Sequence, residues 1–424
     1  MTWLNRIIAS MIICATLGTF VAHAEDGQSL LDRLTKAGAT PSVLYDGDAA
    51  ANMSGGVKQG AAYSGTLHLR LALDGDHLAG LTGWSGWLDA LWIHGTQPGV
   101  FTGDVQGVSN IAASPALRIY EAWIQYNRPD NRFSVLAGRY DLNTEFYQLR
   151  SAALFLNSSF GIGPEFGQSG VAGPSIFPNT SLGVRFAYKP SPVTLVRFAV
   201  LDGAPLDQQN GSPGGFDHRN GLLLIAEAAL LTRPAASDER FAPRYRIGRG
   251  TSPPTYEGKA AIGVWYYTGT FDEFVAANPA ATPARHQGEG GAYFLLDRAL
   301  WQASDDPKRR ITWFVQLGVA DPRVDRFGAY AGAGITAFGV VPSRPADEFG
   351  LAVAMARNGA QYIAGQQQAG LSATAAETAI ELSYLSQIAP WLAVQPDVQY
   401  VIHPNTDPRL RNAIVAQLRV ELKF

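Results

Sequence analysis

The chain has 424 residues, a formal net charge of −3 and only 16% charged residues, against about 25% in an ordinary soluble domain. Its hydrophobic share of 46% excludes an intrinsically disordered chain, and its balanced charge offers no electrostatic footprint for nucleic acid. The single cysteine excludes a disulfide framework and a cysteine-rich metal site. We therefore expect a folded protein with no metal, no cofactor and no nucleic-acid partner.

Residues 1–24 have the three regions of a secretory signal peptide. Arg6 makes the first region positive, residues 7–21 form the apolar region, and the Ala-His-Ala run that follows matches a cleavage site. A membrane anchor, the alternative, is disfavoured because the apolar stretch is short and no basic residues follow it. We expect an exported protein whose mature chain begins near Glu25. Because Cys14 lies in the apolar region, that mature chain contains no cysteine.

The next segment, residues 25–40, is predicted to be a short periplasmic helix because three leucines fall at helical spacing. From residue 41 onward the pattern changes to an alternation of apolar and polar residues. It is clearest at the C-terminus, where every second residue from Ile414 to Phe424 is apolar. Such alternation is typical of strands whose two faces meet different surroundings, including the lipid and water faces of a membrane barrel.

No later stretch approaches the roughly 20 apolar residues of a membrane-spanning helix, so a membrane location would require a closed β-barrel. We predict an all-β fold, a transmembrane antiparallel barrel of the porin type with 16 strands over residues 41–424. Most predicted strands have the ~9–11 residues that a tilted membrane strand needs. They cover residues 41–52, 61–74, 84–95, 115–127, 131–141, 179–190, 192–203, 220–233, 255–268, 288–302, 308–320, 328–339, 346–358, 374–388, 390–403 and 411–424.

The connections between these strands alternate in length, as a barrel with both termini in the periplasm requires. A soluble β-sandwich, the alternative fold, predicts no such asymmetry. One even-numbered connection, residues 234–254, is longer than the rule predicts. The long odd-numbered connections, which we expect on the extracellular side, are residues 96–114, 142–178, 204–219, 269–287 and 359–373.

The longest connection, residues 142–178, contains two glycine-rich runs that end at Pro164 and Pro174. This composition permits a compact folded loop. A sixteen-strand barrel is too wide for its own side chains to fill, so it leaves an aqueous channel whose specificity needs a constriction. We expect the loop to fold inward as the candidate constriction loop. The alternative is an external loop that leaves the pore open.

The polar faces of the predicted strands carry both signs of charge together with aromatic rings. Arginine donors suit sugar hydroxyls and anions, carboxylates accept from hydroxyls, and indole faces can stack on sugar rings. This mixture suits a polar neutral solute better than a simple ion. Glu227, Lys259 and His403 are also predicted to face inward. The candidate solute-binding residues are His68, Arg70, Glu121, Trp123, Arg185, Arg197, Trp265 and Asp397.

Several segments resemble the carbohydrate-selective porin (OprB) family of Gram-negative outer membranes. The matches include residues 119–123, 138–143 and 263–269, and the most specific is the block at 377–404. The resemblance implies a sixteen-strand outer-membrane channel with a short N-terminal helix and an eyelet of arginines and carboxylates. It further implies passive diffusion of glucose-like sugars and small oligosaccharides. Tyr267 stands where the resemblance leads us to expect histidine, which leaves the preferred sugar open.

Two partners and three rival functions follow from this interpretation. The barrel would contact outer-membrane lipid, and Phe424 resembles the terminal aromatic residue by which the outer-membrane assembly machinery recognises barrels. A general, non-selective diffusion porin is the main rival. A barrel enzyme, a lipase or protease, is disfavoured because the chain has no Gly-x-Ser-x-Gly or His-Glu-x-x-His motif. An active-uptake receptor would need a plug domain and around 22 strands, which this length cannot supply.

Overall fold

The strands of the barrel follow the predicted ones closely. The computed structural model describes residues 25–205, 221–232, 257–274, 284–306 and 309–424. The predicted signal peptide and the whole of the long connection at residues 234–254 lie outside these ranges. The strands in the described ranges are β1 Ala39–Gly56, β2 Gly60–Asp74, β3 Trp84–Gly95, β4 Ala116–Asn127, β5 Phe133–Tyr140, β6 Ser181–Ser191, β7 Thr194–Asp202, β8 Leu222–Thr232, β9 Gly258–Asp272, β10 Arg285–Gln302, β11 Arg310–Ala320, β12 Phe327–Phe338, β13 Glu348–Asn358, β14 Ala376–Ala389, β15 Leu392–Ile402 and β16 Arg411–Lys423.

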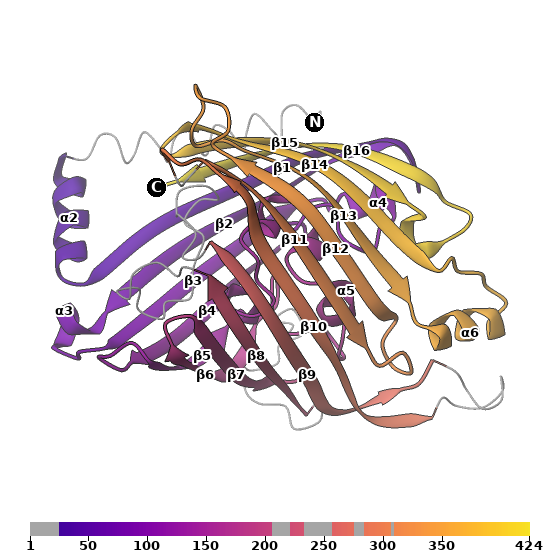
Figure 1. Ribbon diagram of the computed structural model, residues 1–424, viewed down its shortest axis with the longest axis horizontal. Helices are drawn as coiled ribbons and strands as arrows, with labels where there is room; N and C mark the ends of the chain where they lie inside the picture. Colours follow the sequence, from indigo (N-terminus) through magenta and orange to yellow (C-terminus); the bar gives the residue numbers. More distant parts are fainter. Residues whose placement is uncertain (1–24, 206–220, 233–256, 275–283, 307–308) are drawn as a thin grey trace.

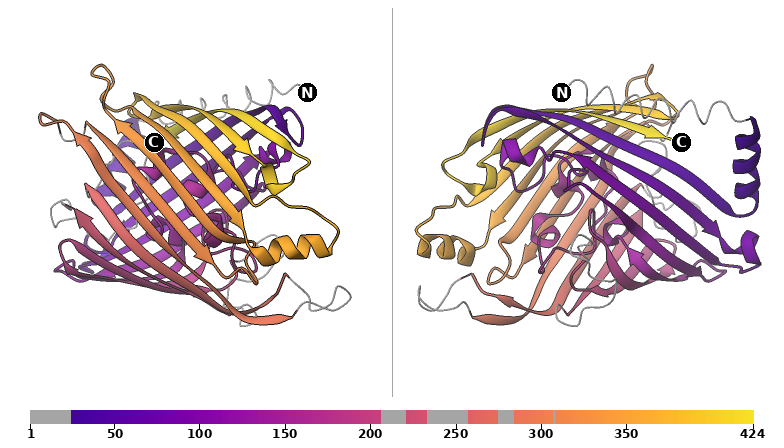
Figure 2. Two further views of the ribbon diagram at one scale, coloured as in Figure 1. Left: turned by 45° about the vertical axis from the view of Figure 1, so that its right-hand side comes forward. Right: turned by 180° about the vertical axis from the view of Figure 1, so that it is seen from behind.

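The strands close into one antiparallel barrel in chain order, with β16 paired to β1 (Figures 1 and 2). The closing register places Asp48 opposite Arg419 and Tyr45 opposite Leu422. All 16 predicted strands are present within a few residues of their expected bounds, so the predicted fold class is confirmed. Closure pairs the edges of the sheet and leaves no open row of backbone donors and acceptors.

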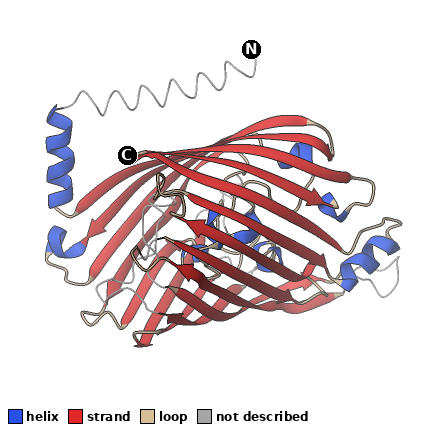
Figure 3. Cartoon of the chain, turned by 45° about the horizontal axis from the view of Figure 1, so that its top comes forward, coloured by secondary structure: helices blue, strands red, loops and turns tan. Residues whose placement is uncertain are grey.

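Short helices occupy the ends and the interior of the barrel (Figure 3). Within the described residues, no helix is both long and apolar enough to cross a membrane. The predicted N-terminal helix is α2, and it ends before Gly38, whose φ of 92° suits glycine. The helices are α2 Glu25–Lys36, α3 Gly75–Ala79, α4 Gly99–Thr102, α5 Pro164–Gly167 and α6 Ala360–Gln368, with 3₁₀ helices η1 Leu142–Thr144, η2 Ala152–Leu154, η3 Ser158–Phe160 and η5 Pro404–Thr406.

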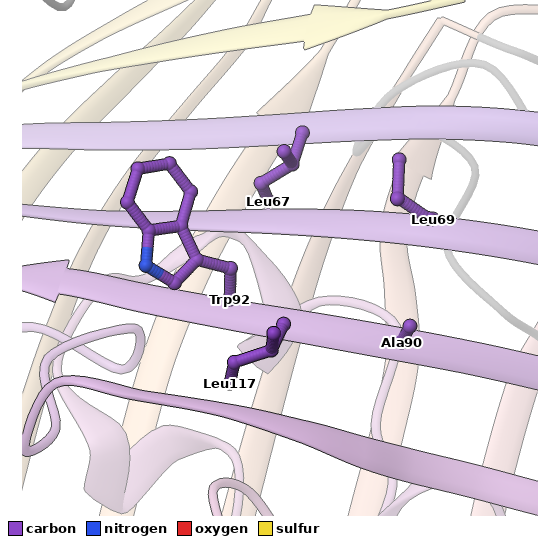
Figure 4. A pocket seen from close by; sticks show the side chains of 5 residues that line it. All are labelled: Leu67, Leu69, Ala90, Trp92 and Leu117. Carbon is purple, nitrogen blue, oxygen red and sulfur yellow. The ribbon is translucent and has the colours of Figure 1, made fainter.

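Each strand presents one apolar face outward and one mixed face inward. In β13 the outward Leu351 is 52% exposed, whereas its inward neighbour Ala352 is 3% exposed. The outer face of β2 to β4 carries a shallow apolar groove of about 350 Å³ (Figure 4). It lies on the face opposite to the polar residues of these strands, so it is part of the outer wall. Its lining residues are Leu67, Leu69, Ala90, Trp92 and Leu117.

Two of the long connections turn back into the barrel. The inward loop, residues 141–180, carries η1, η2, η3 and α5 within the ring of strands (Figure 1). The second inward loop, residues 96–115, contacts it. The Asn110 N–H donates to the Leu156 carbonyl, and the Ser158 N–H donates to the Gly107 carbonyl, both at 2.8 Å. The second loop therefore does not extend outward as its predicted external position implies, because the first loop pairs with its main chain.

The apolar core lies between the inward loop and the wall. The Phe155 and Phe160 rings of the loop lie 5.8 and 6.0 Å from the Phe314 ring of β11. On β13, a side-chain carbon at Gly350 would lie 2.7 Å from both Leu154 and Phe155. The small residues that the sequence places on the inner face of β13 thus allow the loop to approach its backbone closely.

Candidate functional site

A chain of alternating charges links the inward loop to β6, β7, β8 and β9. Arg185 Nε donates to Glu145 Oε2 at 2.7 Å, and Arg197 Nε lies 3.8 Å from Oε1 of the same carboxylate. Arg197 Nη1 lies 3.5 Å from Glu227 Oε1, to which Lys259 Nζ donates at 2.9 Å. Three cations and two carboxylates thus form a row of nearly balanced charge. The predicted Arg185 and Arg197 belong to this row, as do the inward-facing Glu227 and Lys259.

Glu145, on the inward loop, keeps its negative charge in this row. Burial by itself raises the pKa of the Glu145 carboxyl, but Arg185, Arg197 and the Tyr140 hydroxyl together lower it below its ordinary value. The side chain of Arg185 is 0% exposed, whereas that of Arg197 is 15% exposed. Arg185 therefore supports the wall beneath the loop, and Arg197 is the cation of the row that is open to the lumen.

A second polar cluster joins His68 and Arg70 of β2 to Asp89 of β3. His68 Nδ1 and Arg70 Nε both lie 2.9 Å from Asp89 Oδ2. The Tyr120 ring packs edge-on against His68, with 5.9 Å between ring centroids. The two residues predicted from β2 are therefore brought together, and Asp89, which the sequence did not single out, is the acid that joins them.

The inward loop contributes an arginine that the strand pattern could not reveal. Arg150 donates to both oxygens of Glu348, at 3.0 and 3.2 Å, and its side chain is 22% exposed. Alternation cannot find Arg150 because it lies outside the strands. The sequence feature that could have identified Arg150 is that it is the one charged residue between positions 146 and 164.

Wall carboxylates accept hydrogen bonds from the main chain of the inward loop. Near its start, Glu121 Oε1 accepts the Asp141 N–H and Glu227 Oε2 accepts the Tyr147 N–H, each at 3.0 Å. The predicted Glu121 is 0% exposed. The Glu121 carboxylate therefore supports the loop from the wall side and does not face the lumen.

Two further carboxylates continue the same arrangement across the barrel. Asp297 of β10 accepts the Ser151 N–H at 3.0 Å, and Glu381 of β14 accepts the Asn157 N–H at 3.0 Å. The predicted Asp397 shares a side-chain hydrogen bond with Glu381 and is 3% exposed. The loop thus meets β4, β8, β10 and β14 in turn, which carries it around the inner wall.

The two tryptophans predicted to stack on sugar rings are covered. Trp265 packs face to face with Phe166 of α5, at 4.9 Å and 12° between planes, and is 2% exposed. Trp123 stacks on Trp87 at 6.4 Å and 17°, and is 7% exposed. Aromatic partners from the loop and the neighbouring strand cover these faces, so sugar stacking on Trp123 and Trp265 stays a prediction that this arrangement does not favour.

His403 does not face the interior of the barrel. It follows the end of β15, adopts a left-handed φ of 53°, and is exposed. The expectation that His403 continues the strand alternation is wrong because the chain leaves the sheet after Ile402 and turns at Pro404.

Glu377 is a carboxylate of the barrel wall at this end of the barrel. It accepts the Val105 and Gln106 N–H groups of the second inward loop, both at 3.0 Å.

Glu165 is a carboxyl buried inside α5 of the inward loop. It accepts a hydrogen bond from the Tyr147 hydroxyl at 2.9 Å, and its Oε2 has no hydrogen-bond partner among the described residues. Burial raises the pKa of Glu165 to about 7, against a smaller lowering by the Tyr147 hydroxyl. The loop therefore contains an acid that changes charge near neutral pH.

A closed barrel of 16 strands with an inward loop on a charged wall is the architecture of a porin. The family model described as "Carbohydrate-selective porin, OprB family" matches residues 58–424. The chain belongs to this family of channels of the Gram-negative outer membrane.

Known proteins agree with this assignment. Porin B of Pseudomonas aeruginosa is 22% identical over 332 residues, which span 72% of this chain and 68% of that protein. The high-pH structure of Pseudomonas putida OprB has a TM-score of 0.80 at 19% identity, covering 93% of this chain and 96% of that one. The outer-membrane channel DcaP of Acinetobacter baumannii has a TM-score of 0.50 at 12% identity, covering 92% and 98%. These structures share the fold.

Proposed function

We propose that this porin passes glucose-like monosaccharides and small oligosaccharides by facilitated diffusion, and that the inward loop forms the constriction. The observation that carries the proposal is the row from Arg185 to Lys259, in which three cations alternate with two carboxylates and from which Arg197 opens to the lumen. Donors and acceptors of both signs suit the hydroxyls of a neutral sugar. A wall with one sign of charge would instead favour an ion of the opposite sign.

Arg197 and Arg150 are the residues that we assign to solute contact. Their side chains are 15% and 22% exposed, and each is held by a carboxylate that leaves part of the guanidinium open. The planar fork of arginine can donate to two neighbouring hydroxyls at once. We assign His68 and Arg70 to the wall beside this contact. Glu121, Arg185 and Asp397 are more deeply buried, and we assign them to support of the loop and the wall without contact to the solute.

Planar-bilayer conductance with titrated sugars tests the proposal. We expect the single-channel current in salt to fall as glucose or a small oligosaccharide is added, because a bound sugar obstructs the ions. Liposome swelling with glucose, sucrose and amino acids provides the comparison for a general porin. Equal size-normalised rates for the three solutes would show that the channel is not selective for sugars.

Export and assembly are separate parts of the proposal. Residues 1–24 are proposed to act as a cleaved export signal, and Phe424 to be read by the outer-membrane assembly machinery. Phe424 is 46% exposed and exchanges two main-chain hydrogen bonds with Val43, at 2.8 and 2.9 Å. Deletion of Phe424 should lower the amount of assembled barrel in cells. N-terminal sequencing of the purified protein checks the cleavage site.

A further inference from the structure

We propose that Glu381 is a positioning residue that holds the middle of the inward loop by its main chain and so sets the width of the channel. The proposal rests on the proposed role of this loop as the constriction. Glu381 projects from β14 and is 0% exposed. It therefore acts on the channel through the loop and not by touching a solute.

Both oxygens of Glu381 are used by consecutive residues of the loop. Oε1 accepts the Leu156 N–H and Oε2 accepts the Asn157 N–H, the second at 3.0 Å. Neighbouring wall amides support the same turn. Asn157 Nδ2 donates to Gln399 Oε1 at 3.1 Å, and Gln395 Nε2 donates to the Leu154 carbonyl at 2.7 Å.

The contact carries weight because the two loop N–H groups are buried. A buried N–H without an acceptor costs free energy comparable to a lost hydrogen bond. Leu156 and Asn157 are each 0% exposed. If Glu381 no longer accepts from both N–H groups, movement of the turn into the lumen lowers its free energy, because water there can accept from the two donors.

The effect should be local because other anchors are independent. Tyr147 remains on Glu227 and Ser151 remains on Asp297, on strands far from β14 in the barrel order. At the end of the turn, the Tyr330 hydroxyl donates to the Ser159 carbonyl at 2.8 Å, which limits how far the turn can move. We therefore expect loss of the Glu381 contact to free the turn around residues 154–160 and leave the barrel closed.

The test measures loop position directly, through a thiol placed at Ser159. Ser159 is 1% exposed, and Ser159→Cys is close to isosteric. In purified channels carrying this substitution, we measure the rate of maleimide labelling with and without Glu381→Gln. The glutamine side chain accepts one N–H through its oxygen, but its NH2 group faces the other N–H and cannot accept from it. Labelling of the Glu381→Gln channel should therefore be about tenfold faster, or more, than labelling of the parent. Channels without Ser159→Cys give the background rate.

Asp347→Asn is the matched control. Asp347 also accepts a main-chain N–H, from Gln387 at 3.2 Å, but it lies at the β12–β13 turn and holds no part of the inward loop. Its labelling rate should equal that of the parent channel. Equal labelling of the parent and Glu381→Gln channels would overturn the proposal. If Glu381→Gln does not assemble, Glu381→Asp decides by the same assay, because it keeps the carboxyl group but shortens the reach of the side chain.

Single-channel recording separates this inference from the proposed function. Glu381→Gln should add fluctuating conductance levels that the parent and Asp347→Asn channels do not show. A steady current identical to that of the parent counts against Glu381 as the residue that sets the width. If sugars fail to block the parent channel while labelling and fluctuations respond to Glu381→Gln, sugar transport is wrong and the positioning role stands.

Discussion

Asp48 and Arg419 face each other across the seam where the first strand of the barrel meets the last. Arg419 Nε and Nη2 donate to the two oxygens of Asp48, both at 2.6 Å, and the pair is in register on β1 and β16. Both side chains are buried, at 0% and 2% exposure. Asp48 also accepts from the Ser109 hydroxyl at 2.6 Å, so the seam holds the second inward loop as well.

Arg419→Leu should destabilise the barrel, because it leaves the Asp48 carboxylate buried without its cation. We expect the free energy of unfolding to fall by about 3–5 kcal/mol, measured by urea titration in lipid vesicles. Arg409→Leu is the control, since the Arg409–Asp407 pair has a contact of similar length, 2.7 Å, but an arginine that is 80% exposed. That exposed pair should contribute at most about 1 kcal/mol. Similar losses in the two variants would contradict a special role for the seam.

Arg197→Ala should change conduction without unfolding the channel. In this variant Glu145 still pairs with Arg185, and Glu227 still pairs with Lys259, so each carboxylate retains a cationic partner. We expect the preference for anions to fall on the order of twofold and sugar block to weaken. Leu182→Ala, which changes a residue on the outward face of β6, should leave the anion preference and the sugar block unchanged. If both variants behave alike, the assignment of inward and outward faces is wrong.

Leu418→Arg tests the outward face of β16. Leu418 is 44% exposed on the apolar side, so an arginine there would meet hydrocarbon. The expected cost is ~2–4 kcal/mol in the free energy of unfolding if the position lies near the bilayer midplane. Ile414→Arg, closer to the start of β16 on the same face, should cost less, about 0–1 kcal/mol near the interface. Unchanged midpoints for both would place this face away from lipid.

Glu165 should make stability depend on pH in a stated direction. Burial raises the pKa of Glu165 from its ordinary value of 4.5 to about 7, so the folded state binds the proton more tightly than the unfolded state. Stability therefore falls as pH rises from near 4.5 to near 7, and then levels off. The loss amounts to roughly 3 kcal/mol for a shift of this size.

The measurement compares the parent channel with Glu165→Gln, which has the same size and no titrating proton. Urea midpoints at pH 5 and pH 8 should separate, with the parent losing stability relative to the glutamine variant at pH 8. A difference between the two proteins that is constant across this range would mean that Glu165 titrates normally and is not buried in the loop.

The strands were predictable because each carries its own signal. In β13 or β16 the outward side chain meets lipid and the inward one meets the lumen or the loop, so alternation appears within about ten residues. The inward direction of Arg185, Arg197 and Glu227 followed from the same rule. The roles of these side chains did not, because parity cannot separate the buried Arg185 from the more open Arg197.

By itself, the amino-acid sequence determined a barrel of 16 alternating strands, the length of its connections and, apart from His403, which of the named charged side chains turn inward. Only the tertiary structure decided the path of the inward loop, the covering of Trp265 and the pairing of Glu381 with Asn157. The physical reason is that these contacts join residues far apart in the chain, 242 positions for Asn157 and Gln399. Many of them also use main-chain N–H groups, which every residue except proline carries and which therefore leave no mark in a sequence.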